Sequence, residues 1–293
     1  MYGISSNVAF IKGYKKSFLV NFKNHNIFHI DNPEAEEVSK FIKQRFFKKE
    51  EVSSELINFF EEQRMIYKIN SKISKQFPLK TLEYNSKHLI EYLVLDYKDD
   101  LIVQKVLKIC SFFKIPNLII VTNNHLTKKI DDFLSNNFYP ESVTFISDNE
   151  KIYNRKNNFR TFYLKRDKRP FVNKDSMDLN YSLFLESQFY HNYFNKKIFI
   201  DKKGNIKNTP ESEISFGNIY SYNITQVVAK AIFNPNFQKY WKVNKNICNV
   251  CKDCEFRYMC VDNRIPYQKN EYEWFHKTEC DYNPYTATWK EET

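Results

Sequence analysis

Short apolar runs separated by polar turns dominate the start of the chain. The runs at residues 8–11, 18–20 and 27–30 are rich in β-branched and aromatic side chains, and Lys12-Gly13 forms a turn signal between the first two. Runs of this length bounded by turn residues are typical of strands. The pattern predicts three consecutive short strands.

The next segment has helical spacing. Asp31-Asn32-Pro33-Glu34 offers a capping side chain, a proline in the first turn and an acidic residue at the positive end of the helix dipole, which together predict a helix start. Apolar residues then recur at intervals of three and four over 38–46, a second helix opens at Ser53 or Ser54, and 65–69 reads as a closing strand. This order predicts a small winged-helix-like module over residues 1–75.

Residues 76–187 alternate between strand and helix patterns. Such alternation favours parallel βαβ units in an α/β layer. Too few units fit to close an eight-stranded barrel, so we expect a truncated (partial) βα barrel-like scaffold. The expected strands lie at 88–95, 117–121, 143–146 and 159–164, and the expected helices at 101–113 and 125–138.

The last segment, residues 188–293, combines a hairpin signal with a cysteine-rich stretch. Residues 197–206 predict a hairpin that turns at Asp201-Lys202-Lys203-Gly204. Five of the six cysteines follow, in CNVCKDCEFRYMC and KTECDYNPY. The sequence therefore predicts an α/β protein in three parts, the last of which is a metal-binding domain.

Composition narrows the classes of partner. The net charge of +10 is compatible with nucleic acid or an anionic surface. However, the basic residues are scattered, and the abundance of Lys, Asn, Ile, Phe and Tyr is what a biased genome produces, so nucleic acid is not the expected partner. With four glycines, no phosphate-cradling loop of the GxGxxG or GxxxxGK[ST] type can be written. Nucleotide-driven chemistry by this chain alone is therefore not expected.

The expected compartment is the cytoplasm. The chain has no apolar run of the roughly 18 residues that a membrane span needs, and its first ten residues lack the apolar core of a signal peptide. We expect no membrane partner. Clustered thiols in the cytosol indicate metal or redox chemistry rather than structural disulfides.

The thiols Cys248, Cys251, Cys254 and Cys260 stand at intervals that curl a short chain around one point, and Cys280 lies further on. Thiolates select zinc or iron–sulfur clusters over hard cations. Zinc would favour two paired CxxC knuckles, whereas one dense block with a remote cysteine fits a cluster with a distal ligand at least as well. The spacing alone leaves both metals open.

Other candidate ligands are expected to be structural. Cys110 lies on the apolar face of a predicted helix and should be a buried, inert thiol. His191 and His276 are the histidines nearest the cysteines in sequence, and each is expected to have a structural role.

The motif CKDCEFRYMC followed by CDYNPYTATW resembles the C-terminal part of a SPASM domain, the auxiliary iron–sulfur domain of radical SAM peptide maturases, and in particular the grasp-with-spasm family. This resemblance implies that Cys251, Cys254, Cys260 and Cys280 hold one 4Fe-4S cluster, with zinc as the alternative metal. Cys248 would then be a spare thiol or a replacement for Cys251.

Two departures from the family pattern limit what the resemblance implies. Arg264 and Thr209 stand where ligands of a second, inner cluster would be, so that cluster is not expected. No CxxxCxxC motif precedes Cys248, and radical chemistry with S-adenosylmethionine is therefore not expected. No catalytic residue is assigned.

The segment VAFIKGYKKSFLVNFKNHNIFHID resembles the N-terminus of the same family and, more broadly, the winged helix that recognises precursors in ribosomal peptide pathways. The resemblance implies that a leader peptide adds as an extra strand beside Ile27, Phe28, His29 and Ile30.

Three functions follow as hypotheses. In the first, the chain is an accessory protein of peptide maturation that binds the precursor leader and partners an ATP-grasp ligase. In the second, it is a cluster-dependent enzyme that modifies a peptide in the same pathway. In the third, it is a winged-helix nucleic-acid binder with a zinc knuckle.

Overall fold

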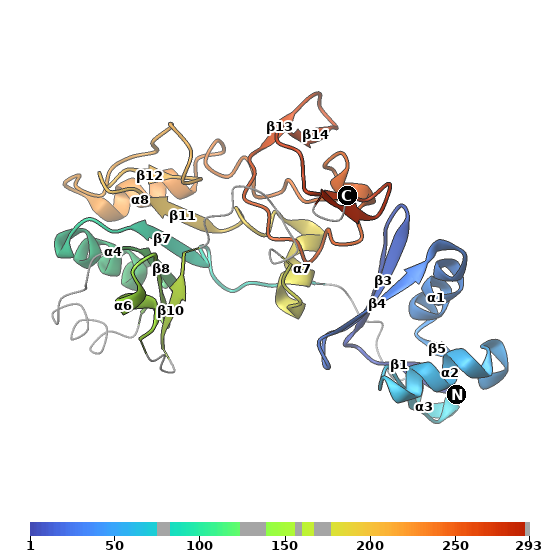
Figure 1. The fold of residues 1–293 in the computed structure, drawn as a ribbon. Helices are drawn as coiled ribbons and strands as arrows, with labels where there is room; N and C mark the ends of the chain where they lie inside the picture. Colours follow the sequence, from blue (N-terminus) through green and yellow to red (C-terminus); the bar gives the residue numbers. More distant parts are fainter. Residues whose placement is uncertain (75–82, 124–138, 156–159, 167–176, 291–293) are drawn as a thin grey trace. The chain divides into compact units, whose positions relative to one another are not determined.

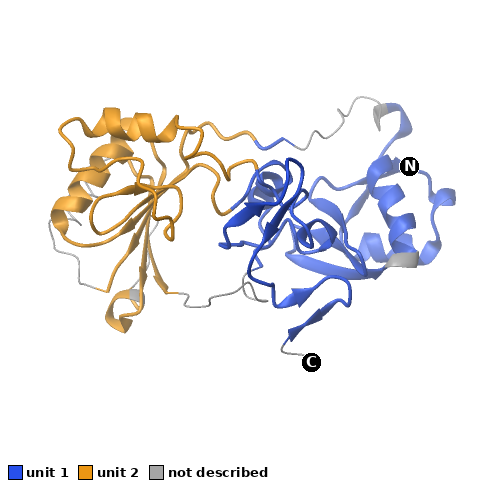
Figure 2. Ribbon diagram, turned by 90° about the horizontal axis from the view of Figure 1, so that it is seen from above, with its two compact units in different colours: residues 1–84, 171–192, 243–293 blue, residues 85–170, 193–242 orange. Residues whose placement is uncertain are grey.

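The computed structural model divides into two compact units, each built from separated stretches of the chain (Figure 2). Unit 1 comprises residues 1–84, 171–192 and 243–293, and unit 2 comprises residues 85–170 and 193–242. Residues from both ends of the chain therefore pack in one unit. The division at residues 75 and 187 stays a prediction. The residues described are 1–74, 83–123, 139–155, 160–166 and 177–290.

Unit 2 is built on a six-stranded sheet of order β10-β9-β8-β7-β11-β12 (Figure 1). All neighbouring strands are parallel except β11 and β12. The first four strands follow one another as in a barrel segment, but β11 pairs with β7 on its other side. The sheet is therefore open, as expected of too few units to close a barrel, and the barrel-like character of this scaffold stays a prediction. The strands are β7 (Tyr92–Asp96), β8 (Asn117–Val121), β9 (Ser142–Ser147), β10 (Thr161–Lys165), β11 (Lys197–Ile200) and β12 (Ile206–Lys207).

Helix α4 (Asp100–Phe113) supplies much of the apolar core of unit 2. The side chain of Asp99 caps it by accepting a hydrogen bond from Ile102 N at 3.0 Å, and the helix ends where Lys114 adopts the left-handed conformation. Cys110 lies on its buried face, as the sequence predicts. The helix expected at 125–138 lies outside the described residues. The other described helices of this unit are α6 (Glu150–Tyr153) and α8 (Ile224–Ile232).

The hairpin predicted over 197–206 is confirmed by β11 and β12. Gly204 closes its turn with φ +80° and donates its N–H to Asp201 O at 2.9 Å. The Asp201 carboxylate accepts the backbone N–H groups of Lys203 and Asn205, both at 2.9 Å. The turn therefore depends on a glycine that tolerates positive φ and on an aspartate that satisfies local donors.

The N-terminal part of unit 1 contains two small antiparallel sheets of order β2-β3-β4 and β5-β1-β6 (Figure 1). The strands β2, β3, β4 and β6 confirm the sequence pattern, whereas β1 and β5 were not predicted. The bounds are β1 (Tyr2–Ile4), β2 (Val8–Lys12), β3 (Lys16–Asn21), β4 (Asn26–Asp31), β5 (Phe46–Phe47) and β6 (Ile66–Lys68).

Helices α1 (Asn32–Gln44) and α2 (Ser54–Glu62) occupy the predicted segments. Ser53 caps α2 by accepting a hydrogen bond from Leu56 N at 3.3 Å. Asp31 stands at the N-cap of α1 in an extended conformation but makes no side-chain capping bond, so that part of the expectation is wrong. A 3-10 turn, η1 (Lys49–Glu51), and helix α3 (Ser71–Ser74) complete the segment.

Strand β3 is buried on both faces because its alternate side chains enter two cores. Leu19 packs with α1 and α2 in one core. Phe18 and Val20 enter the other core, which holds Phe184 and Met259 from later in the chain. The β2-β3-β4 sheet thus lies between helices α1 and α2 on one side and the cysteine-rich stretch on the other.

The cysteine-rich stretch itself consists of turns and very short strands. Helix α7 (Tyr181–Phe189) packs beside it. The elements of the cysteine-rich stretch are η3 (Cys251–Asp253), β13 (Pro266–Gln268), β14 (Trp274–His276), β15 (Tyr282–Asn283) and β16 (Thr288–Trp289).

The described helices of both units are too short or too polar to span a membrane.

Candidate metal centre

Successive tight turns shape the loop that carries the first four thiols of the cluster. Lys252 N donates to Cys248 O at 2.9 Å, and Cys254 N donates to Cys251 O at 3.1 Å. Val250 adopts a positive φ of 68° between the first two thiols. Because each turn reverses the chain within three or four residues, the backbone keeps the thiols of this loop in one small volume.

Both ends of this loop are tied to other parts of unit 1. Asn249 N donates to Trp274 O at 2.7 Å beside Cys248. At the other end, the Asn192 side chain donates to Cys260 O at 2.9 Å and to Ser187 Oγ at 2.9 Å, which links the loop to α7. The position of the thiols is therefore set by hydrogen bonds from distant segments.

Burial raises the pKa of all five thiols in this region, because a thiolate loses hydration there. Two of them receive a compensating hydrogen bond from the backbone two residues later. Tyr282 N donates to Cys280 Sγ at 3.5 Å, and the Phe256 N–H lowers the pKa of Cys254 in the same way. Backbone N–H groups aimed at sulfur favour the thiolate that a metal requires.

Two cations are buried beside the thiols. Lys245 is 5% exposed, and its Nζ donates to Cys260 O at 2.8 Å. Burial lowers the pKa of Lys245, but Cys260 and Asp262 outweigh this effect and raise it above the ordinary value. Arg264 forms a bidentate pair with Asp262 at 2.9 and 2.7 Å. Several thiolates around a cluster or metal ion would place negative charge in this buried region, and these two cations would offset it.

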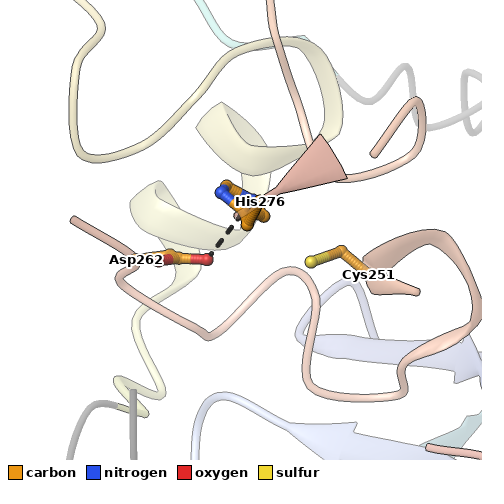
Figure 3. Close-up of side chains that lie close together, drawn as sticks. All are labelled: Cys251, Asp262 and His276. Atoms are coloured by element: carbon orange, nitrogen blue, oxygen red, sulfur yellow. Dashed lines mark ion pairs between the residues drawn. The ribbon is translucent and has the colours of Figure 1, made fainter. Parts of the chain in front are cut away.

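Cys251, Asp262 and His276 converge in this pocket (Figure 3). One ligand atom from each lies within 4.8 Å of the others, and His276 Nε2 is 3.6 Å from Asp262 Oδ2. The His276 side chain is 4% exposed, and its ring faces the Asp262 carboxylate and the backbone of Ile265. Burial lowers the pKa of His276 to about 4, so its ring is neutral near pH 7 and able to bind a metal.

The four predicted ligands lie close enough for their charges to interact. Cys254 interacts with the charges of Cys251 and Cys260, and Cys260 interacts with that of Cys280. In the described part of the chain, however, only the Cys251, Asp262 and His276 group brings three ligand atoms within 4.8 Å. A single zinc would hold its sulfurs about 3.8 Å apart, whereas the sulfurs on a cubane cluster bind different irons and lie further apart. The four side chains offer the sulfur donors that either centre requires, and the identity of the four ligands stays a prediction.

Sequence reasoning did not single out Asp262 or Lys245 and assigned His276 a structural role. Asp262 follows Cys260 by two residues, and His276 precedes Cys280 by four. Their closeness to the cysteines in sequence was the one feature that could have marked them as candidate ligands. Arg264, noted only for standing at a lost ligand position, proves to be the partner of Asp262.

The residues predicted to bind peptide, Ile27, Phe28, His29 and Ile30, all lie on β4. This strand is at the edge of its sheet and pairs with β3 alone among the described strands. The ring of His29 packs edge-on against Phe18 with centroids 4.8 Å apart, and Phe28 packs against Phe59 of α2. The structure places these residues at a sheet edge, and peptide binding there stays a prediction.

No family model and no curated protein matches the chain. Among solved structures, the chain is similar to the crystal structure of Streptococcus suis SuiB, with 13% identity, a TM-score of 0.31, and 95% of this chain and 99% of that chain covered. It is also similar to SuiB bound to S-adenosylmethionine, with 12% identity, a TM-score of 0.31, and 96% and 100% covered. TM-scores at this level do not establish a shared fold.

Proposed function

We propose that this chain is an accessory protein in the maturation of a ribosomally made peptide. It binds the leader of the precursor through the winged-helix-like N-terminal module, partners an ATP-grasp ligase and performs no radical SAM chemistry. One SPASM-type centre, held by Cys251, Cys254, Cys260 and Cys280, stabilises it. The observation that carries the proposal is that one sheet has an open edge at β4 and packs one face against the thiol loop.

The open edge supports peptide recognition by strand addition. In an antiparallel pair, alternate residues direct their N–H and C=O groups away from the partner strand. The register of β3 with its two neighbours leaves Ile27 and His29 directed outward from β4. A leader in extended conformation would pair with these groups.

The contact between the sheet and the thiol loop supports a link between peptide and metal. Phe18 packs edge-on against Phe256 with ring centroids 4.7 Å apart, and Tyr14 N donates to Asp253 O at 2.7 Å. At Gly13 the chain runs so close to Glu255 that a Cβ there would lie 2.7 Å from Glu255 Oε2. A centre that holds the thiol loop in place would therefore also stabilise the β2-β3-β4 sheet, to which the edge strand β4 belongs.

The resident group we propose is one 4Fe-4S cluster, with zinc as the alternative. When bound, it supplies a thiolate-ligated anchor for the loop and, if it is a cluster, a redox centre. The chain's own residues prepare its place: backbone N–H groups point at Cys254 and Cys280, and Lys245 offsets charge. Cys248 is assigned the role of a spare or exchange thiol.

Calorimetry of the full chain with leader peptide and with ligase tests the proposal. His29→Pro removes an outward N–H from β4, whereas His29→Ala keeps it and serves as the matched control. We expect leader affinity to fall about tenfold or more in the proline variant and little in the alanine variant. Absence of measurable binding to both leader and ligase would contradict the proposed function.

A second candidate is a cluster-dependent enzyme that modifies a peptide in the same pathway. It is favoured by the convergence of Asp262 and His276 on Cys251, which offers a site with ligands other than the four thiols. Three protein ligands of mixed type are what catalytic metal sites use when one coordination position stays open. Mass spectrometry of precursor incubated with this protein alone and a reductant distinguishes the two. A changed mass would favour the enzyme, and an unchanged mass favours the binding role.

A further inference from the structure

The second edge of the β2-β3-β4 sheet opens into a groove that the proposed function does not use. A cavity of about 750 Å³ lies along β2, with Val8, Ala9 and Phe10 at its base. The C-terminal half of α1 lines one part of it, and α7 together with Arg257 lines another. A neighbouring cavity of about 510 Å³ extends along α1 and shares Lys12 and Lys43 with the first. All these residues belong to unit 1.

The backbone at the base of this groove offers unpaired groups. Strand β2 pairs with β3 alone among the described strands, and Phe22 N donates to Asn7 O at 2.9 Å. Since hydrogen-bonded and non-bonded pairs alternate, Val8, Phe10 and Lys12 direct their backbone groups outward. Val8 N bonds to Ser5 O and Lys12 O accepts from Arg257, so both groups of Phe10 are left for another strand.

Basic side chains predominate around the groove. Lys12, Lys43, Arg45 and Arg257 line the larger cavity, which has no acidic residue among its described lining. The carboxylates nearby are Glu36, which lines the neighbouring cavity, and Glu255, which interacts with the charge of Arg257. The Nε of Arg257 is buried without a hydrogen-bond partner in the described part of the chain, while its Nη1 donates to Cys254 O at 2.8 Å and to Lys12 O at 2.5 Å. A buried guanidinium N–H without an acceptor is unfavourable unless a ligand satisfies it.

We infer that this groove docks an extended, acidic peptide segment that adds to β2 as a strand and places a carboxylate at Arg257. The inference rests on the proposed function in one respect, namely that this module handles peptides, but it assigns a different edge from β4. Because Arg257 also bonds the carbonyl of Cys254, the docked segment would touch the loop that carries the metal ligands.

Fluorescence anisotropy with a defined probe tests this inference on the full chain. The probe is a labelled decapeptide in which glutamate alternates with valine. A lysine–valine decapeptide tests charge, and a copy N-methylated at alternate residues tests strand pairing. We expect Lys12→Glu/Lys43→Glu to weaken binding of the acidic probe about tenfold or more. The control Lys108→Glu/Lys230→Glu changes the net charge equally at exposed sites in unit 2 and should weaken it less than about twofold.

The outcomes separate this inference from the proposed function. Loss of binding in the groove variant and with the N-methylated probe, but not in the control variant, supports the groove. Equal weakening in the groove and control variants, or undiminished binding of the methylated probe, overturns it. If the groove is overturned in this way but His29→Pro still weakens leader binding, the proposed leader site at β4 stands without the groove. If the acidic probe binds at the groove and no leader binds at β4, the groove stands and the proposed leader site fails.

Discussion

The sheet of unit 2 and the cysteine-rich stretch of unit 1 are stabilised in different ways. In unit 2, β7, β8 and α4 bury a continuous set of apolar side chains at nearly zero exposure. In the cysteine-rich stretch, β13 to β16 are only two or three residues long, and the buried side chains include Lys245, Glu255 and Asp262. Strands this short bury too little apolar surface to be stable alone. In the function proposed above, ligation would replace much of the missing core.

Removal of the metal should destabilise the cysteine-rich stretch far more than the sheet of unit 2. With a chelator and reductant, we expect amides over residues 245–290 to lose protection from hydrogen exchange by orders of magnitude, because ligation energy becomes folding energy in small metal-bound regions. Amides of β7 and β8 should change little. Equal loss of protection in both regions, or none in either, would show that the metal does not hold the cysteine-rich stretch.

Asp262→Asn should produce the next largest effect. It leaves Arg264 without the carboxylate that it pairs with and removes one of the negative charges that act on buried Lys245. The loss of one partner from a buried pair costs about 3–5 kcal/mol. The matched control is Asp148→Asn in unit 2, where Asp148 pairs with Arg166 at 3.7 Å and is partly exposed. That change should cost less than about 1 kcal/mol. Urea unfolding of both metal-loaded variants measures the difference, and equal costs would count against the buried charge network.

Cys110 and Cys254 provide a sharper contrast between a packing thiol and a ligand thiol. Cys110→Ala should lower the free energy of unfolding by about 1–2 kcal/mol and leave the metal content unchanged, because its pKa is raised by burial and it lies in an apolar core. Cys254→Ala should lose most of the metal. Metal analysis of both purified variants checks this, and full metal content in Cys254→Ala would remove that residue from the ligand set.

The smallest effects concern helix caps. Asp99→Ala and Ser53→Ala each remove a side-chain acceptor for a backbone N–H, from α4 and α2 respectively, and each should cost about 1 kcal/mol. Asp31→Ala should cost less, since Asp31 makes no capping bond. Thermal unfolding ranks the three, and a larger effect at Asp31 would contradict the geometry at the start of α1.

Local patterns were sufficient for most elements, including α4, with its apolar spacing, and the hairpin closed by Gly204. Long-range pairing was not predictable in the same way. Tyr2–Ile4 carries too short a signal, and its strand exists because it pairs with β5 and β6 from later segments. Likewise, nothing local to Lys197–Ile200 indicates that it joins the sheet beside β7.

The candidate site shows the same limit. Spacing identified the thiols, because ligands within one loop are close in sequence. It did not identify the approach of His276 to Cys251, since this contact depends on how β14 folds back over the loop. Nor did it identify the pair of Asp262 and Arg264, which are only two residues apart but pair through the local conformation of the chain. Burial of Lys245 is likewise a property of the packed pocket and not of its neighbours in sequence.

We propose that the cysteine-rich stretch of unit 1 holds one thiolate-ligated cluster. Anaerobic metal and sulfide analysis of the purified chain, together with its visible spectrum, is the decisive test of this centre. We expect about four irons and four sulfides per chain and a broad absorbance that bleaches with dithionite. A colourless protein with stoichiometric zinc would reject the cluster, and a protein without metal whose cysteines all react freely would contradict the thiolate centre itself.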